Sequence, residues 1–134
     1  MKPETLEWIK KAEGDYQVAK KEFRSDKPVF DAVCFHAQQC IEKYLKAWFS
    51  ENHRQFPRTH DLIVLFELGR DKLTELVIHR SSLAFLTTFA IAFRYPGDEA
   101  LIEDAQEALE KMESIRLLLR WRLGVEKRDS GEKL

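Results

Sequence analysis

Residues 35–47, Phe-His-Ala-Gln-Gln-Cys-Ile-Glu-Lys-Tyr-Leu-Lys-Ala, have a spacing that decides the fold of this chain. At about 100° per residue, apolar side chains gather on one broad face of a helix and polar ones lie opposite. The apolar face comprises Phe30, Val33, Cys34, Ala37, Cys40, Ile41, Tyr44, Leu45 and Trp48. The polar stripe comprises His36, Gln39, Lys43, Lys46 and Ser50. Its hydrogen-bonding and basic groups could serve a partner, a phosphate or water.

Helical spacing continues on both sides of this stretch, and no segment alternates strictly as a strand would. Five Gly and four Pro mark the breaks. We therefore expect an all-α, up-and-down helical bundle of about five helices, four long and one short. The expected helices run from just after Pro3 to near Ser25-Asp26-Lys27-Pro28, from about Val29 to Glu51, from about Asp61 to Leu68, from Ser81 or Ser82 to Phe93, and from about Asp98 or Glu99 to Leu123. The fourth is apolar nearly all round, which predicts burial on several sides.

Length and charge indicate a single domain of ordinary composition. The 134 residues, 44% of them apolar, are enough for one core. We expect a bundle over residues 1–126 and a flexible polar tail over residues 127–134. With 22 basic and 23 acidic side chains, attraction to nucleic acid is not a property of the whole chain. Any such binding must come from a local patch.

Cys34 and Cys40 lie six positions apart on one apolar helix face, which suits buried thiols in a reducing cytoplasm. No run approaches the roughly 20 apolar residues of a membrane span. Sequence motifs for phosphate loops, nucleophile elbows and zinc helices are lacking, and His53 and His79 have no neighbours at ligand spacing. We therefore expect a cytoplasmic protein with no membrane segment, no metal and no cofactor.

Three places are candidates for binding. His36, Gln39 and Lys43 could hold a nucleotide phosphate or RNA, although most amphipathic helices carry a similar polar face. Arg94, before the turn at Tyr95-Pro96-Gly97, could contact a phosphate or an acidic partner, or bond the carbonyls that end its own helix. His60 adjoins Asp61, which with Thr59 is a candidate helix N-cap, so His60 could bind a ligand or simply pack locally.

Large apolar side chains are numerous for so small a core. The set comprises Trp48, Phe49, Leu118, Leu119 and Trp121. A symmetric homodimer would cover those that one chain leaves exposed, so we expect a homodimer.

Taken together, residues 35–47, the triplet His60-Asp61-Leu62 and the pentapeptide Phe93-Arg94-Tyr95-Pro96-Gly97 resemble the HEPN domain family, in particular small prokaryotic members with the Arg-Tyr-Pro turn. The resemblance extends to Glu103-Asp104-Ala105 and Glu107-Ala108-Leu109. It implies a bundle of about five helices and frequent homodimerisation. It also implies a bacterial or archaeal setting in which many relatives pair with a minimal nucleotidyltransferase, as a complex or as toxin and antitoxin. Other relatives bind nucleotides.

A large branch of that family consists of metal-independent ribonucleases, which use an Arg followed within a few residues by a His. Here Arg94 stands at the expected place, but no His follows His79. The later imidazole that would act as general acid or base is therefore missing. Arg54 and His60 match the spacing formally, but Pro57 lies between them and we interpret the match as coincidence. A composite site of Arg94 with His36 or His60 stays open.

The sequence thus favours a homodimeric binding module for a nucleotide or a minimal nucleotidyltransferase partner, with Arg94, Tyr95, His36, Gln39, Lys43 and His60 as ligand contacts. The alternatives are an RNA-cleaving toxin and an interaction subunit without a ligand.

Overall fold

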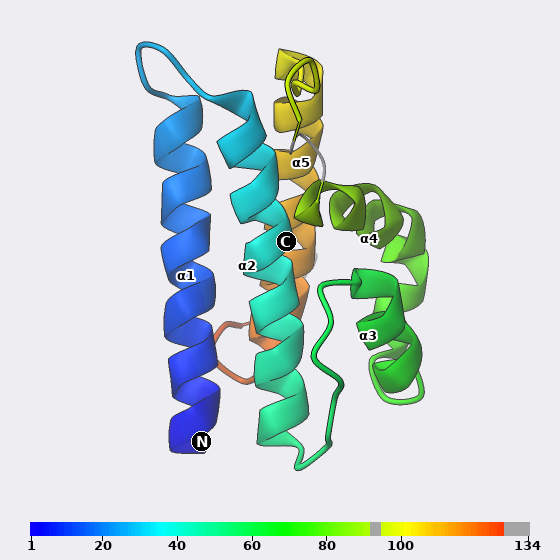
Figure 1. Cartoon of the computed structure of the whole chain (residues 1–134). Coiled ribbons are helices and arrows are strands. Elements are labelled where there is room, and N and C mark those ends of the chain that lie inside the picture. Colours follow the sequence, from blue (N-terminus) through cyan, green and yellow to red (C-terminus); the bar gives the residue numbers. More distant parts are fainter. Residues whose placement is uncertain (92–94, 128–134) are drawn as a thin grey trace, which may run out of the picture.

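A computed structural model describes residues 1–91 and 95–127, and every regular element within those ranges is helical (Figure 1). The α-helices are α1 (Pro3–Phe23), α2 (Phe30–Glu51), α3 (Leu62–Gly69), α4 (Arg80–Thr87) and α5 (Ile102–Arg122). Two 3₁₀ segments, η1 (Thr74–His79) and η2 (Thr88–Ala90), flank α4. The all-α bundle of five helices is confirmed. Of the expected tail, residues 128–134 lie outside the described ranges.

The fourth helix is shorter than the sequence indicated, so the bundle has three long helices and two short ones. It has eight residues, and its N-cap is His79, where Ser81 or Ser82 was expected. Threonine side chains compete for the backbone at its end: Thr88 Oγ1 donates to the Phe85 carbonyl at 2.8 Å. The expected burial on several sides holds in part, since Leu83, Leu86 and Phe89 are buried whereas Ile91 beyond η2 is 66% exposed.

The three long helices pack side by side, and α3 and α4 cover the flank of α2 away from α1 (Figure 1). The helices α1 and α2 form an antiparallel hairpin. Contacts of Glu13 with Arg116 and of Tyr16 with Glu113 show that α5 is antiparallel to α1. It therefore runs parallel to α2, because the α3–α4 segment returns the chain to the end where α2 begins. No described helix combines the length and the apolarity that a bilayer span requires.

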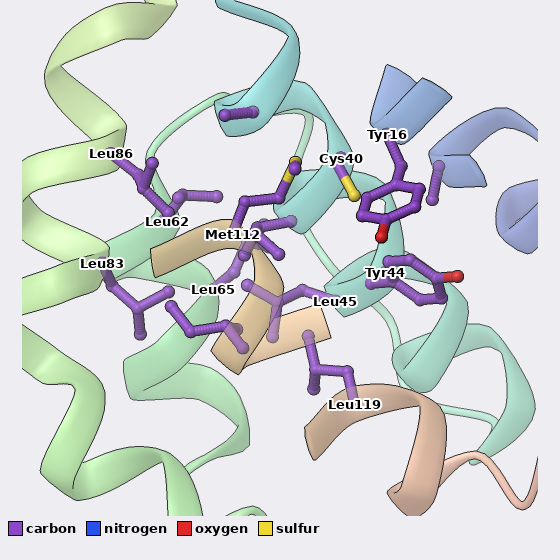
Figure 2. Close-up of a cluster of buried hydrophobic side chains, with 14 of the residues drawn as sticks. Tyr16, Cys40, Tyr44, Leu45, Leu62, Leu65, Leu83, Leu86, Met112 and Leu119 are labelled. Atoms are coloured by element: carbon purple, nitrogen blue, oxygen red, sulfur yellow. The ribbon is translucent and has the colours of Figure 1, made fainter. Parts of the chain in front are cut away.

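The apolar face predicted for α2 supplies the centre of the core (Figure 2). Of its nine side chains only Phe30 is partly exposed. Cys34 and Cys40 are free thiols with no exposed surface. Burial raises the pKa of Cys34 to about 12 and that of Cys40 well above its ordinary value. Both thiols are therefore protonated and unreactive in the folded chain.

The large apolar side chains that predicted a homodimer are mostly buried within one chain. Trp48, Phe49 and Leu119 are buried, and Leu118 and Trp121 are partly buried. A single copy of the bundle therefore covers three of the five, and only Leu118 and Trp121 keep surface that a second copy could cover.

Gly14 occupies an exposed interior position of α1, where a β-carbon would meet no atom within 4 Å. The Gly14→Ala variant is therefore expected to raise the free energy of unfolding by about 0.5–1 kcal/mol, because alanine restricts the unfolded chain and favours the helix. Urea unfolding followed by circular dichroism measures the change. Gly97→Ala is the matched control: its surroundings are equally open, but its φ of +95° should make alanine destabilising. Equal effects of the two changes would contradict this explanation.

Candidate functional site

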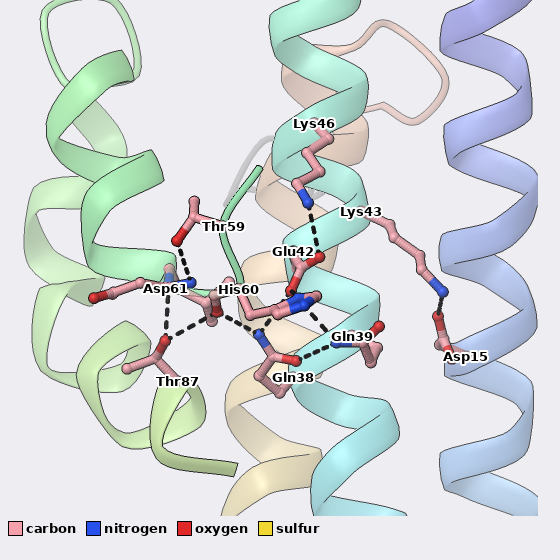
Figure 3. A network of polar contacts seen from close by, with 11 residues as sticks. Asp15, Gln38, Gln39, Glu42, Lys43, Lys46, Thr59, His60, Asp61 and Thr87 are labelled. Carbon is pink, nitrogen blue, oxygen red and sulfur yellow. Dashed lines mark hydrogen bonds and ion pairs between the residues drawn. The ribbon is translucent and has the colours of Figure 1, made fainter. Parts of the chain in front are cut away.

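Glu42 of α2 lies at the centre of a polar cluster that joins α2 to residues 59–61 (Figure 3). Its side chain is only 3% exposed. Lys46 Nζ donates to it at 2.9 Å and Gln38 Nε2 at 3.1 Å, and His60 Nδ1 lies 3.0 Å from Oε1. Burial alone would raise the pKa of Glu42, but these hydrogen bonds outweigh burial and lower it. Glu42 is therefore a charged carboxylate inside the bundle.

The backbone at His60 is held as firmly as its ring. Gln38 Nε2 donates to the His60 carbonyl at 2.9 Å, and the Thr87 hydroxyl donates to the same oxygen at 3.3 Å. Thr87 Oγ1 also accepts from the Leu62 N–H at 2.8 Å. Asp61 caps α3 by accepting from Ile63 N, which confirms it as the N-cap. The start of α3 is thus fixed between α2 and the end of α4.

The ring of His60 has one nitrogen fixed and the other free. Its Nδ1 faces Glu42, yet the side chain is 68% exposed. Because the carboxylate can only accept, the hydrogen-bond network assigns the proton of a neutral ring to Nδ1 and leaves Nε2 as an acceptor. Within the described ranges nothing bonds Nε2. This is a carboxylate-oriented imidazole with its second nitrogen available to a ligand.

A second carboxylate holds the other side of the polar stripe. Asp15 of α1 accepts from Lys43 Nζ at 2.6 Å, and His36 Nδ1 lies 2.7 Å from its other oxygen. Burial would raise the pKa of Asp15, but the hydrogen bonds from His36 and Lys43 outweigh it and lower the pKa. Asp15 therefore neutralises the positive charge of Lys43 within the bundle.

The polar stripe predicted on α2 is largely an internal packing surface. Lys46 and Ser50 are buried, and Gln39 Nε2 donates to Gln38 Oε1 at 2.7 Å. The stripe also divides, since His36 and Lys43 contact α1 whereas Lys46 reaches the Glu42 cluster beside α3 (Figure 3). It does not form one continuous cationic surface.

The other candidate residues are Tyr95, Arg94 and Arg54, and the described residues among them do not form one site. Tyr95 is 69% exposed, and Arg94 lies outside the described residues, so the composite site with His36 or His60 stays a prediction. Arg54 donates to the Leu68 carbonyl at 2.7 Å and to Asp71 at 3.0 Å. These contacts give Arg54 a role at the end of α3, in keeping with the interpretation of its spacing from His60 as coincidence.

Sequence reasoning missed both carboxylates that organise these clusters. Asp15 had a detectable signal, because an acid stands at helical spacing among the buried residues Ala12, Tyr16 and Ala19. Glu42 stood inside the recognised stretch but received no role. Its partner His60 lies 18 positions further along the chain, so nothing local indicates the contact.

Comparisons with curated proteins and with solved structures gave no match. The family model of the HEPN domain matches residues 5–121. That range extends from the first turn of α1 to the last turn of α5 and includes both carboxylate clusters. The chain therefore belongs to the HEPN domain family.

Proposed function

We propose that this HEPN-domain protein is a binding module that acts as a homodimer in the cytoplasm and takes a nucleotide at the side of α2 where His60 lies. The observation that carries the proposal is the imidazole of His60, fixed by buried Glu42 at one nitrogen and open at the other. A ring held in one orientation loses little entropy on binding. Its Nε2 accepts from a ribose hydroxyl or, when protonated, donates to a phosphate.

Tyr95 and Arg94 complete the proposed contacts. The exposed ring of Tyr95 is suited to stack on a base, and Arg94 would supply the charge for a phosphate. His36, Gln39 and Lys43 have a lesser part in this proposal. With Lys43 neutralised by Asp15, the hydrogen-bonding groups of His36 and Gln39 contribute more than charge does.

A minimal nucleotidyltransferase is the proposed protein partner, in a system of toxin–antitoxin type. Among the residues that the structure describes, three of the four most exposed large apolar side chains, Ile91, Tyr95 and Leu101, lie between η2 and α5. Exposed apolar groups so concentrated support a protein interface at this end of the bundle. The mass of the purified protein, alone and mixed with a nucleotidyltransferase encoded beside it, tests the homodimer and the complex.

His60→Ala is expected to weaken binding of ATP about tenfold or more, because it removes a hydrogen bond to a charged or hydroxyl group. Isothermal titration calorimetry measures the affinity. His53→Ala is the matched control, since His53 is exposed at the far end of α2 and should leave the affinity unchanged. An intact affinity in His60→Ala would refute the site. If ATP neither binds nor shifts the melting temperature of the wild type, the ligand-free interaction subunit is favoured.

Cleavage of RNA is the second candidate, because a carboxylate-oriented imidazole is also the arrangement of a general base. Incubation of the purified protein with RNA in EDTA distinguishes the two functions. Cleavage that both His60→Ala and Arg94→Ala abolish would overturn the binding module. RNA that stays intact while ATP binds supports it.

A further inference from the structure

From residue 10 onward the outward face of α1 exposes Lys and Arg but no acid, whereas its first two turns expose Glu4 and Glu7. Seven residues between positions 10 and 24 are exposed, four of them Lys or Arg and none acidic: Lys10, Lys11, Gly14, Gln17, Val18, Lys21 and Arg24. At 100° per residue, all but Lys11 and Val18 lie within an arc of about 80°. They form a single stripe, called here the α1 basic face.

Two of the three acids of the same segment, Glu13 and Asp15, turn inward and are neutralised there, and the third, Glu22, accepts hydrogen bonds from Ser25 and from the Val29 N–H. Glu13 accepts from Arg116 Nε at 2.8 Å and from its Nη2 at 2.7 Å, and the Tyr44 hydroxyl also donates to it. Asp15 is held by His36 and Lys43. Cations of α2 and α5 therefore neutralise Glu13 and Asp15, and the exposed lysines of this segment are left without an ion-pair partner among the described residues.

The three cations of the α1 basic face, Lys10, Lys21 and Arg24, and the neighbouring Lys11 have no hydrogen-bond or ion-pair partner among the described side chains. Most other exposed or half-buried arginines behave differently, Arg58 excepted. Arg54 pairs with Asp71, Arg70 with Glu67 and Arg122 with Glu75. The α1 basic face is thus the part of the described surface where cations gather unpaired.

The near-zero net charge of the chain gives no sign of the α1 basic face. Five exposed acids lie around the first half of α5: Asp98, Glu99, Glu103, Glu107 and Glu110. Within the described part of the chain, Glu107 is the one of these acids that pairs with a lysine, Lys111. The charge balance is therefore a sum of separate basic and acidic surfaces, and the local patch that nucleic-acid binding requires is present on α1.

We propose that the α1 basic face binds the phosphate backbone of a duplex nucleic acid. From Lys10 to Arg24 the stripe extends over about 21 Å, which is long enough to meet several phosphates. Gly14 leaves the middle of the stripe open, and Gln17 offers an amide that contacts phosphate or sugar. Contacts of this kind are independent of sequence.

Other anionic partners fit this face less well. Single strands are held by aromatic rings on which bases stack, and the exposed residues from 10 to 24 include none. A helix that lies in a membrane surface inserts its apolar face, but that of α1 is packed against α2. A duplex backbone needs only charge, length and close approach, and α1 supplies all three.

Fluorescence anisotropy with labelled duplex RNA, duplex DNA and single-stranded RNA of one sequence tests the proposal. At about 25 mM salt the duplexes should bind more tightly than the single strand. The dependence of duplex affinity on salt concentration should correspond to the release of about three ions. The two duplex arms tell which nucleic acid is preferred. Tighter binding of the single strand, or no binding to either duplex at that salt concentration, would overturn the proposal.

Lys10→Glu/Lys21→Glu should weaken duplex binding at least tenfold. Lys72→Glu/Lys127→Glu makes the same change in net charge on exposed residues away from α1 and should weaken it less than threefold. An equal loss in both variants would refute the assignment to α1. The nucleotide site is independent of this face, so Lys10→Glu/Lys21→Glu should bind ATP as the wild type does, and failure of one proposal leaves the other intact.

Discussion

Glu42→Ala is expected to lower the free energy of unfolding by about 3–5 kcal/mol. The change would leave the Lys46 ammonium, only 9% exposed, without its carboxylate. It would also remove the acceptor that Gln38 and His60 share. Urea unfolding, followed by circular dichroism at neutral pH, measures the loss.

Two controls separate the buried pair from a general effect of charge. Glu107→Ala removes the exposed carboxylate that Lys111 contacts and should cost about 0–1 kcal/mol. Glu42→Leu/Lys46→Met replaces both charges by apolar groups and should recover much of the stability, because no charge is left buried alone. A loss below about 1 kcal/mol in Glu42→Ala would show that water reaches Lys46 and that the cluster is not rigid.

Stability should fall steeply as the pH is lowered from about 5 toward 3, because several carboxylates have lowered pKa values in the folded chain, among them three that join segments of the bundle. They are Glu13, Asp15 and Glu42. For each, burial acts to raise the pKa, and hydrogen bonds with neighbouring cations outweigh it. The unfolded chain, with ordinary pKa values of 3.8 for Asp and 4.5 for Glu, therefore binds protons first. The stabilisation is complete above those values and is lost as the pH falls through the lower folded ones.

Urea midpoints at several pH values between about 7 and 3 measure this dependence. Asp15→Asn is the informative variant. It should be less stable than the wild type at pH 7, because His36 and Lys43 lose their carboxylate, yet it should lose less stability on acidification. A flat profile, or stability that rises toward acid, would mean that the ion pairs do not hold the bundle together.

The sequence was sufficient for the elements that local patterns specify. Spacing along residues 35–47 placed α2 and its buried face, and Asp61 was recognised as a candidate N-cap before α3. The family resemblance, confirmed by the HEPN domain match, supplied the overall class of fold. Apolar periodicity and capping residues act over a few positions, so they can be interpreted without knowing where other helices lie.

The sequence was not sufficient where distant segments decide the outcome. The end of α4 depends on Thr87, whose hydroxyl joins the start of α3, and such a contact leaves no periodic trace. From the sequence, the polar stripe could be interpreted as free to bind a ligand, because its partners, Asp15 and Glu42, could not be assigned from spacing alone. The free nitrogen of His60 likewise emerges only when its other nitrogen is seen on a buried carboxylate.

The labelling rates of the two thiols of α2 can report how the bundle opens. Cys34 lies near Asp31 and Asp104, at the end where α5 begins, whereas Cys40 lies deeper, beside Tyr16 (Figure 2). Because neither thiol reacts while buried, labelling each would report the free energy of the opening that exposes it. Faster labelling of Cys34 would reveal a local fluctuation at the end that carries Tyr95 and Leu101. Equal labelling would show that the core opens only as a whole.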